Sequence, residues 1–125
     1  MKIALAQINT TVGDFAGNEA KILAAYERAA QAGAELAVFP ELAVCGYPPR
    51  DLLHKPAFIP QMLATVDRLA RASGRTGMLV GFAGKNEQRP GREATNAAAL
   101  LQHGKIVATR LKTLLPTYDV FDDDR

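Results

Sequence analysis

The stretch that decides the fold reads Glu35-Leu36-Ala37-Val38-Phe39-Pro40-Glu41. A short apolar run of this kind is typical of a buried strand. We expect the strand to end at Phe39 or Pro40, because proline has no amide hydrogen to donate to a sheet. The run lies between two segments in which apolar residues recur at helical spacing. This alternation predicts an α/β fold with helices packed against a sheet.

The segment before this run predicts one strand and one helix. Lys2–Ile8 mixes alternation with small apolar residues, which indicates a strand buried on at least one face. Asn18 follows a turn-rich stretch and is placed to cap a helix, and Gly33 is placed to end it. The apolar residues of this helix are Ile22, Leu23, Tyr26, Ala29 and Ala30.

The segment after the run begins with a long loop and continues with a second helix. Residues 43–56 contain Gly46, Pro48, Pro49 and Pro56, so we expect an irregular loop with one helical turn at 50–53. The second helix is predicted by three- and four-residue steps. Its apolar residues are Ile59, Met62, Leu63, Val66, Leu69 and Ala70. A strand over Thr76–Ala83 and a polar loop over Gly84–Glu93 follow.

The last part of the chain predicts a hairpin and then an irregular tail. Strands over 94–101 and 105–109 flank His103-Gly104, and a tight turn there needs a positive φ at Gly104, so we expect antiparallel pairing. The tail from Leu111 to Arg125 carries apolar residues without a clear period or closing element. We therefore expect their partners to lie in sequence beyond this chain, which would make it a truncated domain.

Composition narrows the class of protein. The chain has 125 residues, and fifteen Lys and Arg against thirteen Asp and Glu give a net charge of +2. This charge is small and scattered, so no nucleic-acid or membrane partner is expected. One cysteine, no signal segment and no apolar run of about 18 residues indicate a cytoplasmic protein.

Two charged side chains stand where ligands bind in α/β sheets. Glu41 follows the strand over 35–39, and the crevice beyond strand ends suits a carboxylate for acid/base work. Lys112 follows the last hairpin strand and could stabilise an oxyanion if the two strand ends are neighbours. The alternative for each is an ordinary solvated surface charge.

The sequence supports other candidate site residues less strongly. Cys45 is expected to be a buried small hydrophobe, because free cysteine is among the most buried residue types. Tyr47 either lines the pocket or packs on the following prolines. No metal site is expected, because the two histidines are 49 positions apart without partners at ligand spacing. Gly81–Lys85 lacks the spacing of a phosphate-binding loop.

Several strings, in order and spacing, resemble the carbon–nitrogen hydrolase (nitrilase) superfamily over the whole chain. They are Ala4-Leu5-Ala6-Gln7-Ile8-Asn9, Phe39-Pro40-Glu41-Leu42 and Arg110-Leu111-Lys112-Thr113-Leu114-Leu115-Pro116. Within the superfamily, two further strings look like the amidotransferase domain of the glutamine-dependent NAD⁺ synthetases. These are Gly46-Tyr47-Pro48-Pro49-Arg50-Asp51-Leu52-Leu53 and the tail from Lys112 through Tyr118 to Phe121-Asp122-Asp123-Asp124-Arg125.

The resemblance implies a Glu-Lys-Cys amidase site. In it Glu41 is the proton acceptor that activates a thiol, Lys112 stabilises the oxyanion, and Tyr118 helps to bind glutamine, with Tyr47 as a further lining residue. The family's nucleophilic Cys follows the Lys, on a later strand, and Cys45 does not match it. The implied fold is part of an α-β-β-α sandwich, incomplete in this chain, which self-associates.

The resemblance also implies that two domains carry out two different reactions. Residues 1–125 would be the N-terminal portion of a glutaminase domain that supplies ammonia, and a synthetase domain absent from this chain would use ATP and Mg²⁺ to amidate deamido-NAD⁺. No cofactor is expected in this chain, and the chain alone is expected to be inactive. A stand-alone amidase or nitrilase and a non-catalytic assembly fragment are the alternatives.

Overall fold

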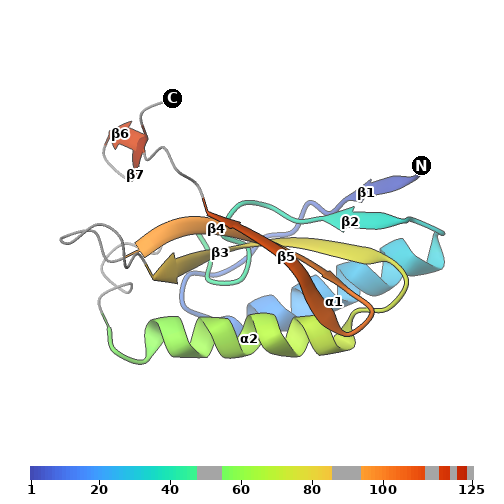
Figure 1. The fold of residues 1–125 in the computed structure, drawn as a ribbon, viewed down its shortest axis with the longest axis horizontal. Coiled ribbons are helices and arrows are strands. Elements are labelled where there is room, and N and C mark those ends of the chain that lie inside the picture. Colours follow the sequence, from blue (N-terminus) through green and yellow to red (C-terminus); the bar gives the residue numbers. More distant parts are fainter. Residues whose placement is uncertain (48–54, 86–93, 112–115, 119–120, 124–125) are drawn as a thin grey trace.

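The computed structural model describes residues 1–47, 55–85, 94–111, 116–118 and 121–123 (Figure 1). Five strands form one sheet in the order β1-β2-β3-β4-β5, and two helices connect the first three. The elements are β1 (Ile3–Leu5), α1 (Phe15–Gln31), β2 (Leu36–Val38), α2 (Phe58–Ala72), β3 (Gly77–Lys85), β4 (Ala94–Gln102) and β5 (Lys105–Leu111). The α/β class predicted from the sequence is confirmed.

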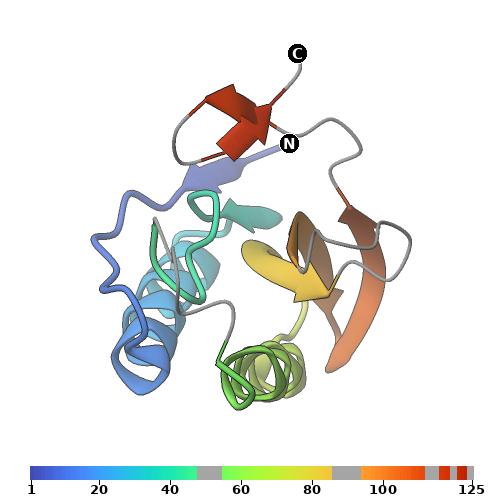
Figure 2. The same cartoon turned by 90° about the vertical axis from the view of Figure 1, so that its left-hand side faces the viewer.

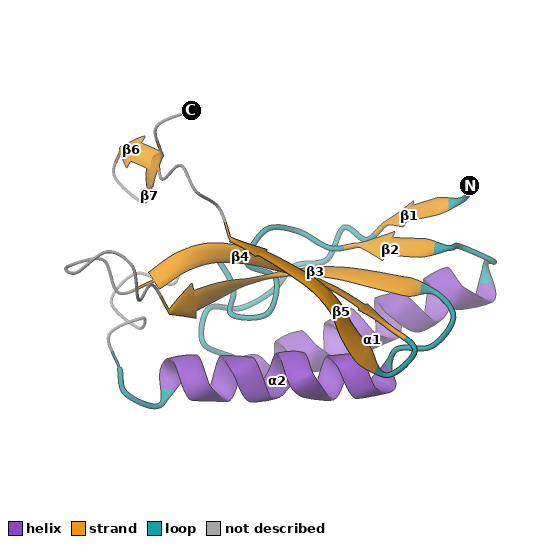
Figure 3. Cartoon of the chain, viewed as in Figure 1, coloured by secondary structure: helices purple, strands orange, loops and turns teal. Residues whose placement is uncertain are grey.

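The sheet is mixed. β1, β2 and β3 run parallel, whereas β4 and β5 pair antiparallel to their neighbours. Both helical connections step in the same direction along the sheet. Because such crossovers are right-handed, both helices must lie on the same face. Figures 2 and 3 show α1 and α2 side by side below the sheet, with no helix on the other face of the described part.

The first helix begins earlier than the sequence predicted. Asp14 is the N-cap of α1, and its carboxylate accepts a hydrogen bond from the amide of Gly17 (3.0 Å). Asn18, expected to be the cap, instead lies inside the helix with a fully buried side chain. The prediction was wrong because its amide has tertiary partners that no local pattern reveals. Gly33 follows the helix with φ 81°, as expected for a left-handed C-terminal residue.

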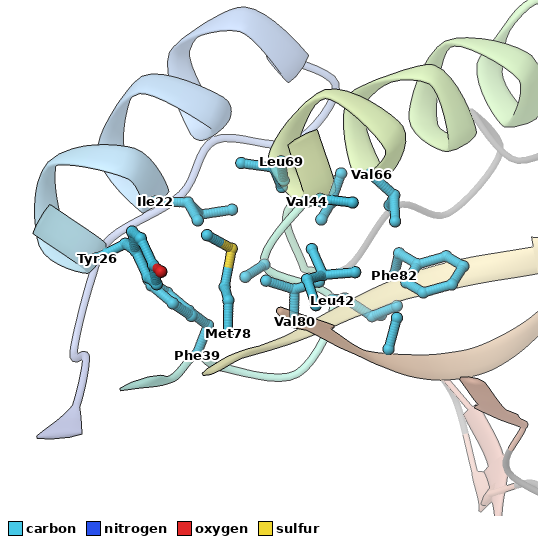
Figure 4. Packing of buried hydrophobic residues seen from close by; sticks show 14 of the residues in the cluster. Ile22, Tyr26, Phe39, Leu42, Val44, Val66, Leu69, Met78, Val80 and Phe82 are labelled. Atoms are coloured by element: carbon cyan, nitrogen blue, oxygen red, sulfur yellow. The ribbon is translucent and has the colours of Figure 1, made fainter. Parts of the chain in front are cut away.

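The second helix is confirmed and closes the core. Its buried side chains include all the predicted apolar positions except Leu63, which is exposed, and Ile59, which is partly buried. Between the helices and the sheet lies a single cluster of buried side chains (Figure 4). At the surface Arg68 of α2 donates to Glu19 of α1 (2.9 Å), which ties the two helices together.

The hairpin of β4 and β5 is confirmed, including its antiparallel pairing and its turn. His103 and Gly104 have φ values of 53° and 77°. Two successive positive values are typical of the tight turn that matches the right-handed twist of its strands. The amide of His103 donates to the carbonyl of Gly74 (2.9 Å), so the turn is also anchored to the segment before β3.

Several element boundaries differ from the predictions. β1 is shorter than Lys2–Ile8, β2 ends at Val38, and β3 continues beyond Ala83 to Lys85. The tail is not wholly unpaired, because β6 (Pro116–Tyr118) and β7 (Phe121–Asp123) form their own antiparallel pair. The helical turn expected at 50–53 lies outside the described residues.

The two faces of the sheet differ in what covers them. Ala37, Met78 and Leu101 are register neighbours on the helix side, and all three are fully buried. On the opposite face Leu5, at the edge, is 75% exposed, and its register neighbours Val38 and Leu79 are half-buried. Apolar side chains thus remain open to solvent on the face that carries no helix here.

Candidate active site

The segment after β2 turns beside β3 instead of extending the sheet. The amide of Phe39 donates to the carbonyl of Leu79 (3.0 Å), and the amide of Val44 donates to the carbonyl of Gly81 (3.2 Å). Between these two contacts the chain makes a compact turn over residues 40–46. We call residues 40–46 the β2 turn. It follows the carboxyl end of β2 and lies beside the middle of β3. Ligands of α/β sheets bind outside the carboxyl ends of the strands.

The β2 turn is strained and tightly packed. Leu42 has φ 56°, a left-handed conformation that is a genuine outlier for a bulky residue. Its side chain is buried and points into the core together with Val44 (Figure 4). A Cβ on Gly81 would lie 2.6 Å from the backbone nitrogen of Leu42 and 3.2 Å from the Cα of Glu41. Only glycine at position 81 therefore lets the turn approach β3 this closely.

Glu41 lies on this turn, with its side chain exposed, and it lines a hollow of about 430 Å³. Asn96 of β4 donates a hydrogen bond from Nδ2 to Oε1 of Glu41. The hollow lies against the middle of β3, the first half of β4 and the end of β5, with Ala98, Arg110 and Leu111 among its lining residues. Glu41 thus follows the end of β2, and its role as an acid/base group stays a prediction.

Cys45 is on the same turn but does not line the hollow. Its side chain is fully buried, and Sγ lies 3.5 Å from the carbonyl oxygen of Gly46. Burial raises the pKa of the Cys45 thiol from 9.0 to about 11. A thiol of this kind is protonated at neutral pH and inaccessible, so it is not suited to be a nucleophile. The expectation of a buried small hydrophobe is confirmed.

A buried amide supports the turn from the helix side. Asn18 of α1 donates from Nδ2 to the carbonyl oxygens of Thr11 (2.8 Å) and Val44 (3.1 Å). Its Oδ1 accepts from the amide of Thr11 (2.8 Å), and the amide of Gly13 donates to the carbonyl of Cys45 (2.9 Å). The loop after β1 and the β2 turn are thereby joined, which restricts the backbone that carries Glu41.

The remaining residues predicted for the site are only partly described. Lys112 lies outside the described residues, although Leu111 directly before it lines the Glu41 hollow. Tyr118 is the last residue of β6, where the backbone is described but the side chain is not. Tyr47 follows the β2 turn, and its side chain is half exposed.

Sequence reasoning missed three residues of the site. Before the terminal Gln102, β4 otherwise holds alanine, leucine and one threonine, so the amide of Asn96 was a usable signal. Leu42 and Gly81 carried no such signal, because their roles depend on the contact between the turn and β3.

The described residues bear on two other kinds of site, a metal-ligand cluster and a phosphate-binding loop at residues 81–85. No group of three or more His, Cys, Asp or Glu side chains among the described residues is placed to hold a metal ion. Gly81–Lys85 lies in β3, so this segment is a strand and does not form a phosphate-binding loop. No helix in the described ranges has both the length and the apolar character needed to cross a membrane.

Comparison with known proteins identifies relatives over nearly the whole chain. The carbon–nitrogen hydrolase family model matches residues 2–123. The glutamine-dependent NAD⁺ synthetase of Synechocystis sp. is 45% identical over 127 residues, which cover 98% of this chain and 23% of that protein. The chain thus spans about a fifth of the length of the curated relatives that it matches.

Solved structures share the fold. The glutamine-dependent NAD⁺ synthetase from Acinetobacter baumannii, in complex with adenosine diphosphate, superposes with a TM-score of 0.84 at 32% identity, over 96% of this chain and 22% of that one. An amidase from Nesterenkonia sp. superposes with a TM-score of 0.75 at 27% identity, over 95% of this chain and 44% of that one. The fold is therefore nitrilase-like, and this chain covers only part of it.

Proposed function

Because this chain belongs to the carbon–nitrogen hydrolase family, we propose that it forms the N-terminal part of the glutamine-hydrolysing domain of a glutamine-dependent NAD⁺ synthetase. The observation that carries the proposal is the position of Glu41. Its carboxylate lines an open hollow on a strained, buried turn, and backbone strain of this kind is concentrated at functional sites. Relatives that are 45% and 38% identical to this chain are glutamine-dependent NAD⁺ synthetases.

In this proposal Glu41 is the general base. It takes the proton of a cysteine thiol contributed from outside residues 1–125, and the thiolate attacks the amide carbon of glutamine. The family relative from Nesterenkonia has an active-site cysteine. Cys45 is excluded from this role by its burial, so the chain by itself is proposed to release no ammonia.

Lys112 is proposed to stabilise the negative charge that develops on the amide oxygen in the tetrahedral intermediate. The support is backbone placement, because Leu111 ends β5 on the wall of the Glu41 hollow and pairs with Ala97, next to Asn96. Lys112 follows Leu111 directly in the sequence. Tyr118 and Tyr47 are proposed to hold the rest of the glutamine.

The reaction then proceeds in two steps. The carbon–nitrogen bond breaks, the amide nitrogen leaves as ammonia with the proton that Glu41 had taken, and a glutamyl thioester remains. Water, deprotonated by Glu41, hydrolyses the thioester to glutamate and the free thiol. The ammonia is proposed to amidate deamido-NAD⁺ in a synthetase domain that holds ATP and Mg²⁺. We also propose a cytoplasmic location and assembly into a homo-oligomer.

The test uses the protein expressed from its complete reading frame, supplied with ATP, deamido-NAD⁺ and glutamine labelled with ¹⁵N in its amide. Wild type should release glutamate and place ¹⁵N in NAD⁺. Glu41→Gln should lower both by about 10²- to 10⁴-fold, the range for loss of a general base. Synthesis from added ammonium should stay at the wild-type rate.

The matched control is Glu35→Gln, which removes the same charge from the other end of the β2 region and should change neither rate. The proposal fails if Glu41→Gln hydrolyses glutamine as fast as wild type. It also fails if the variant, although folded, loses the ammonium-driven reaction to the same extent.

A stand-alone amidase is the second candidate, favoured by the superposition on the Nesterenkonia enzyme. That candidate predicts hydrolysis of simple amides at rates equal to or above those for glutamine, and no NAD⁺ formation with either nitrogen source. The same assay, run with acetamide beside glutamine, separates the two.

A further inference from the structure

Asn96 is a buried amide on the wall of the Glu41 hollow. It is 7% exposed, and Ala97 beside it is 3% exposed. The surrounding β4 run accepts alanine at three successive positions after it, so packing alone would be met by a small apolar side chain. A buried amide is retained at little cost only where its hydrogen bonds are satisfied.

The partner that satisfies this amide is the candidate base itself. Asn96 Nδ2 donates to Glu41 Oε1, and among the described residues this is the hydrogen bond that the Glu41 carboxylate accepts. Arg110 also lines the hollow, but its guanidinium donates to the carbonyl of Thr109 (2.9 Å). In the described part of the chain, the neutral amide of Asn96 is therefore what orients the carboxylate.

We propose that Asn96 is a positioning residue for Glu41 in glutamine hydrolysis. The proposal rests on the proposed function. The terminal torsion of a glutamate side chain has a broad energy profile, so an unheld carboxylate samples many orientations. The bond from Nδ2 holds Oε1 in place, and the proposal assigns to Oε2 the transfer of the proton from the thiol and later from water.

Different residues thus fix the backbone and the side chain of Glu41. Gly81 and the left-handed Leu42 fix where the Cα of Glu41 lies, and Asn96 fixes where its carboxylate points. Because proton transfer needs a heavy-atom separation of about 3 Å, an error of about 1 Å at the tip is enough to cost about 10²-fold in rate.

The first test variant is Asn96→Leu, which keeps the side-chain volume and removes the donor. In the protein from the complete reading frame, kcat for glutamine hydrolysis should fall by about 10²-fold, with an unchanged KM for glutamine. NAD⁺ synthesis from ammonium should be unaffected. The matched control is Gln102→Leu on the same strand, which removes the bond from Nε2 to the carbonyl of Arg75 (2.8 Å) and should leave kcat unchanged.

The second variant, Asn96→Asp, keeps both volume and polarity and carries the test if the leucine variant does not fold. Its introduced carboxylate faces Glu41, with Arg110 on the same wall, and offers no donor when ionised. At lower pH the two carboxyls share a proton, which restores a donor at position 96. Its kcat should therefore be far below wild type at neutral pH and recover partly as the pH falls. A purely structural role predicts no such recovery.

The outcomes separate the two proposals. If wild type hydrolyses glutamine, Glu41→Gln does not, and Asn96→Leu equals wild type, only the positioning role is overturned. The role is also overturned if the Asn96 variants lose ammonium-driven synthesis and melting temperature in parallel with glutamine hydrolysis. If wild type itself hydrolyses no glutamine, the proposed function fails first.

Discussion

The β2 turn and the hairpin turn between β4 and β5 share a backbone feature but differ in what explains it. Each has a non-glycine residue with positive φ, 56° at Leu42 and 53° at His103. At His103 the conformation is local, because a tight hairpin requires it and Gly104 follows. At Leu42 no local rule requires it, and the residue is buried against β3.

The two turns also differ in how firmly the rest of the structure holds them. The hairpin turn is exposed, and a Cβ on Gly104 would meet nothing within 4 Å. The β2 turn is held from both sides, by Gly81 of β3 and by Asn18 of α1. Strain that is held so firmly by packing is typical of functional sites, and it supports the role proposed for Glu41.

The largest effect on the free energy of unfolding is expected from Gly81→Ala, which disturbs the contact between β3 and the buried β2 turn. The added methyl would lie 2.6 Å from the backbone of Leu42, and backbone cannot give way as a flexible side chain does. We expect a loss of about 3 kcal/mol in the free energy of unfolding in urea. In the protein from the complete reading frame, the proposed glutamine hydrolysis should be lost as well.

Gly74→Ala is the matched control, because the nearest atom to its Cβ is the hydroxyl oxygen of Tyr26 at 4.0 Å. It should change stability by less than about 0.5 kcal/mol. Equal losses for the two variants would mean that the close approach at Gly81 is not what holds the turn.

A smaller change in the free energy of unfolding is expected when the Cys45 thiol titrates. This change measures how well the β2 turn is buried. The pKa of the thiol is raised by burial to about 11 in the folded chain and is near 9.0 when the chain unfolds. Between these values the unfolded state releases the thiol proton and the folded state retains it. Stability is therefore full below pH 9 and falls as the pH rises, by about 2 kcal/mol at pH 11.

Urea titrations of wild type and Cys45→Ala between pH 8 and about 11 measure this contribution, since other titrating groups affect both proteins alike. The alanine variant should show the shallower decline. Parallel curves for the two proteins would indicate that the thiol is already in contact with solvent.

The smallest effect is expected at the exposed turn. His103→Asn places a residue that tolerates positive φ before Gly104, so the free energy of unfolding should rise by about 0.5 kcal/mol. In the protein from the complete reading frame, the proposed glutamine hydrolysis should not change, because this turn lies at the opposite end of β4 from Asn96. A thermal melt checks the stability and an activity assay checks the hydrolysis. A loss of activity would mean that the hairpin turn affects the proposed site as much as the β2 turn does.

The sequence was sufficient to predict features that depend on neighbouring residues in the chain. The helix over 58–72, the antiparallel hairpin and the positive φ of Gly104 follow from spacing and turn chemistry, and all were predicted. The position of Glu41 after a buried strand was also predicted. What the resemblance implied for its chemistry stays a proposal.

Features that depend on contacts between distant parts of the sequence could not be predicted from the sequence. Asn18 has the local character of a cap, but its partners Thr11 and Val44 draw it into the interior. The conformation of Leu42 depends on a glycine 39 positions away on β3. The donor to Glu41 comes from Asn96 on β4, which only the sheet register brings near.

The most direct test is a crystal structure of the protein from its complete reading frame with glutamine bound to an inactive variant of the nucleophilic cysteine. We predict that the Glu41 carboxylate and the Lys112 amine both lie within about 4 Å of the bound amide, with Asn96 still donating to Oε1. An amide bound elsewhere, or Lys112 on a different surface from Glu41, would contradict the account.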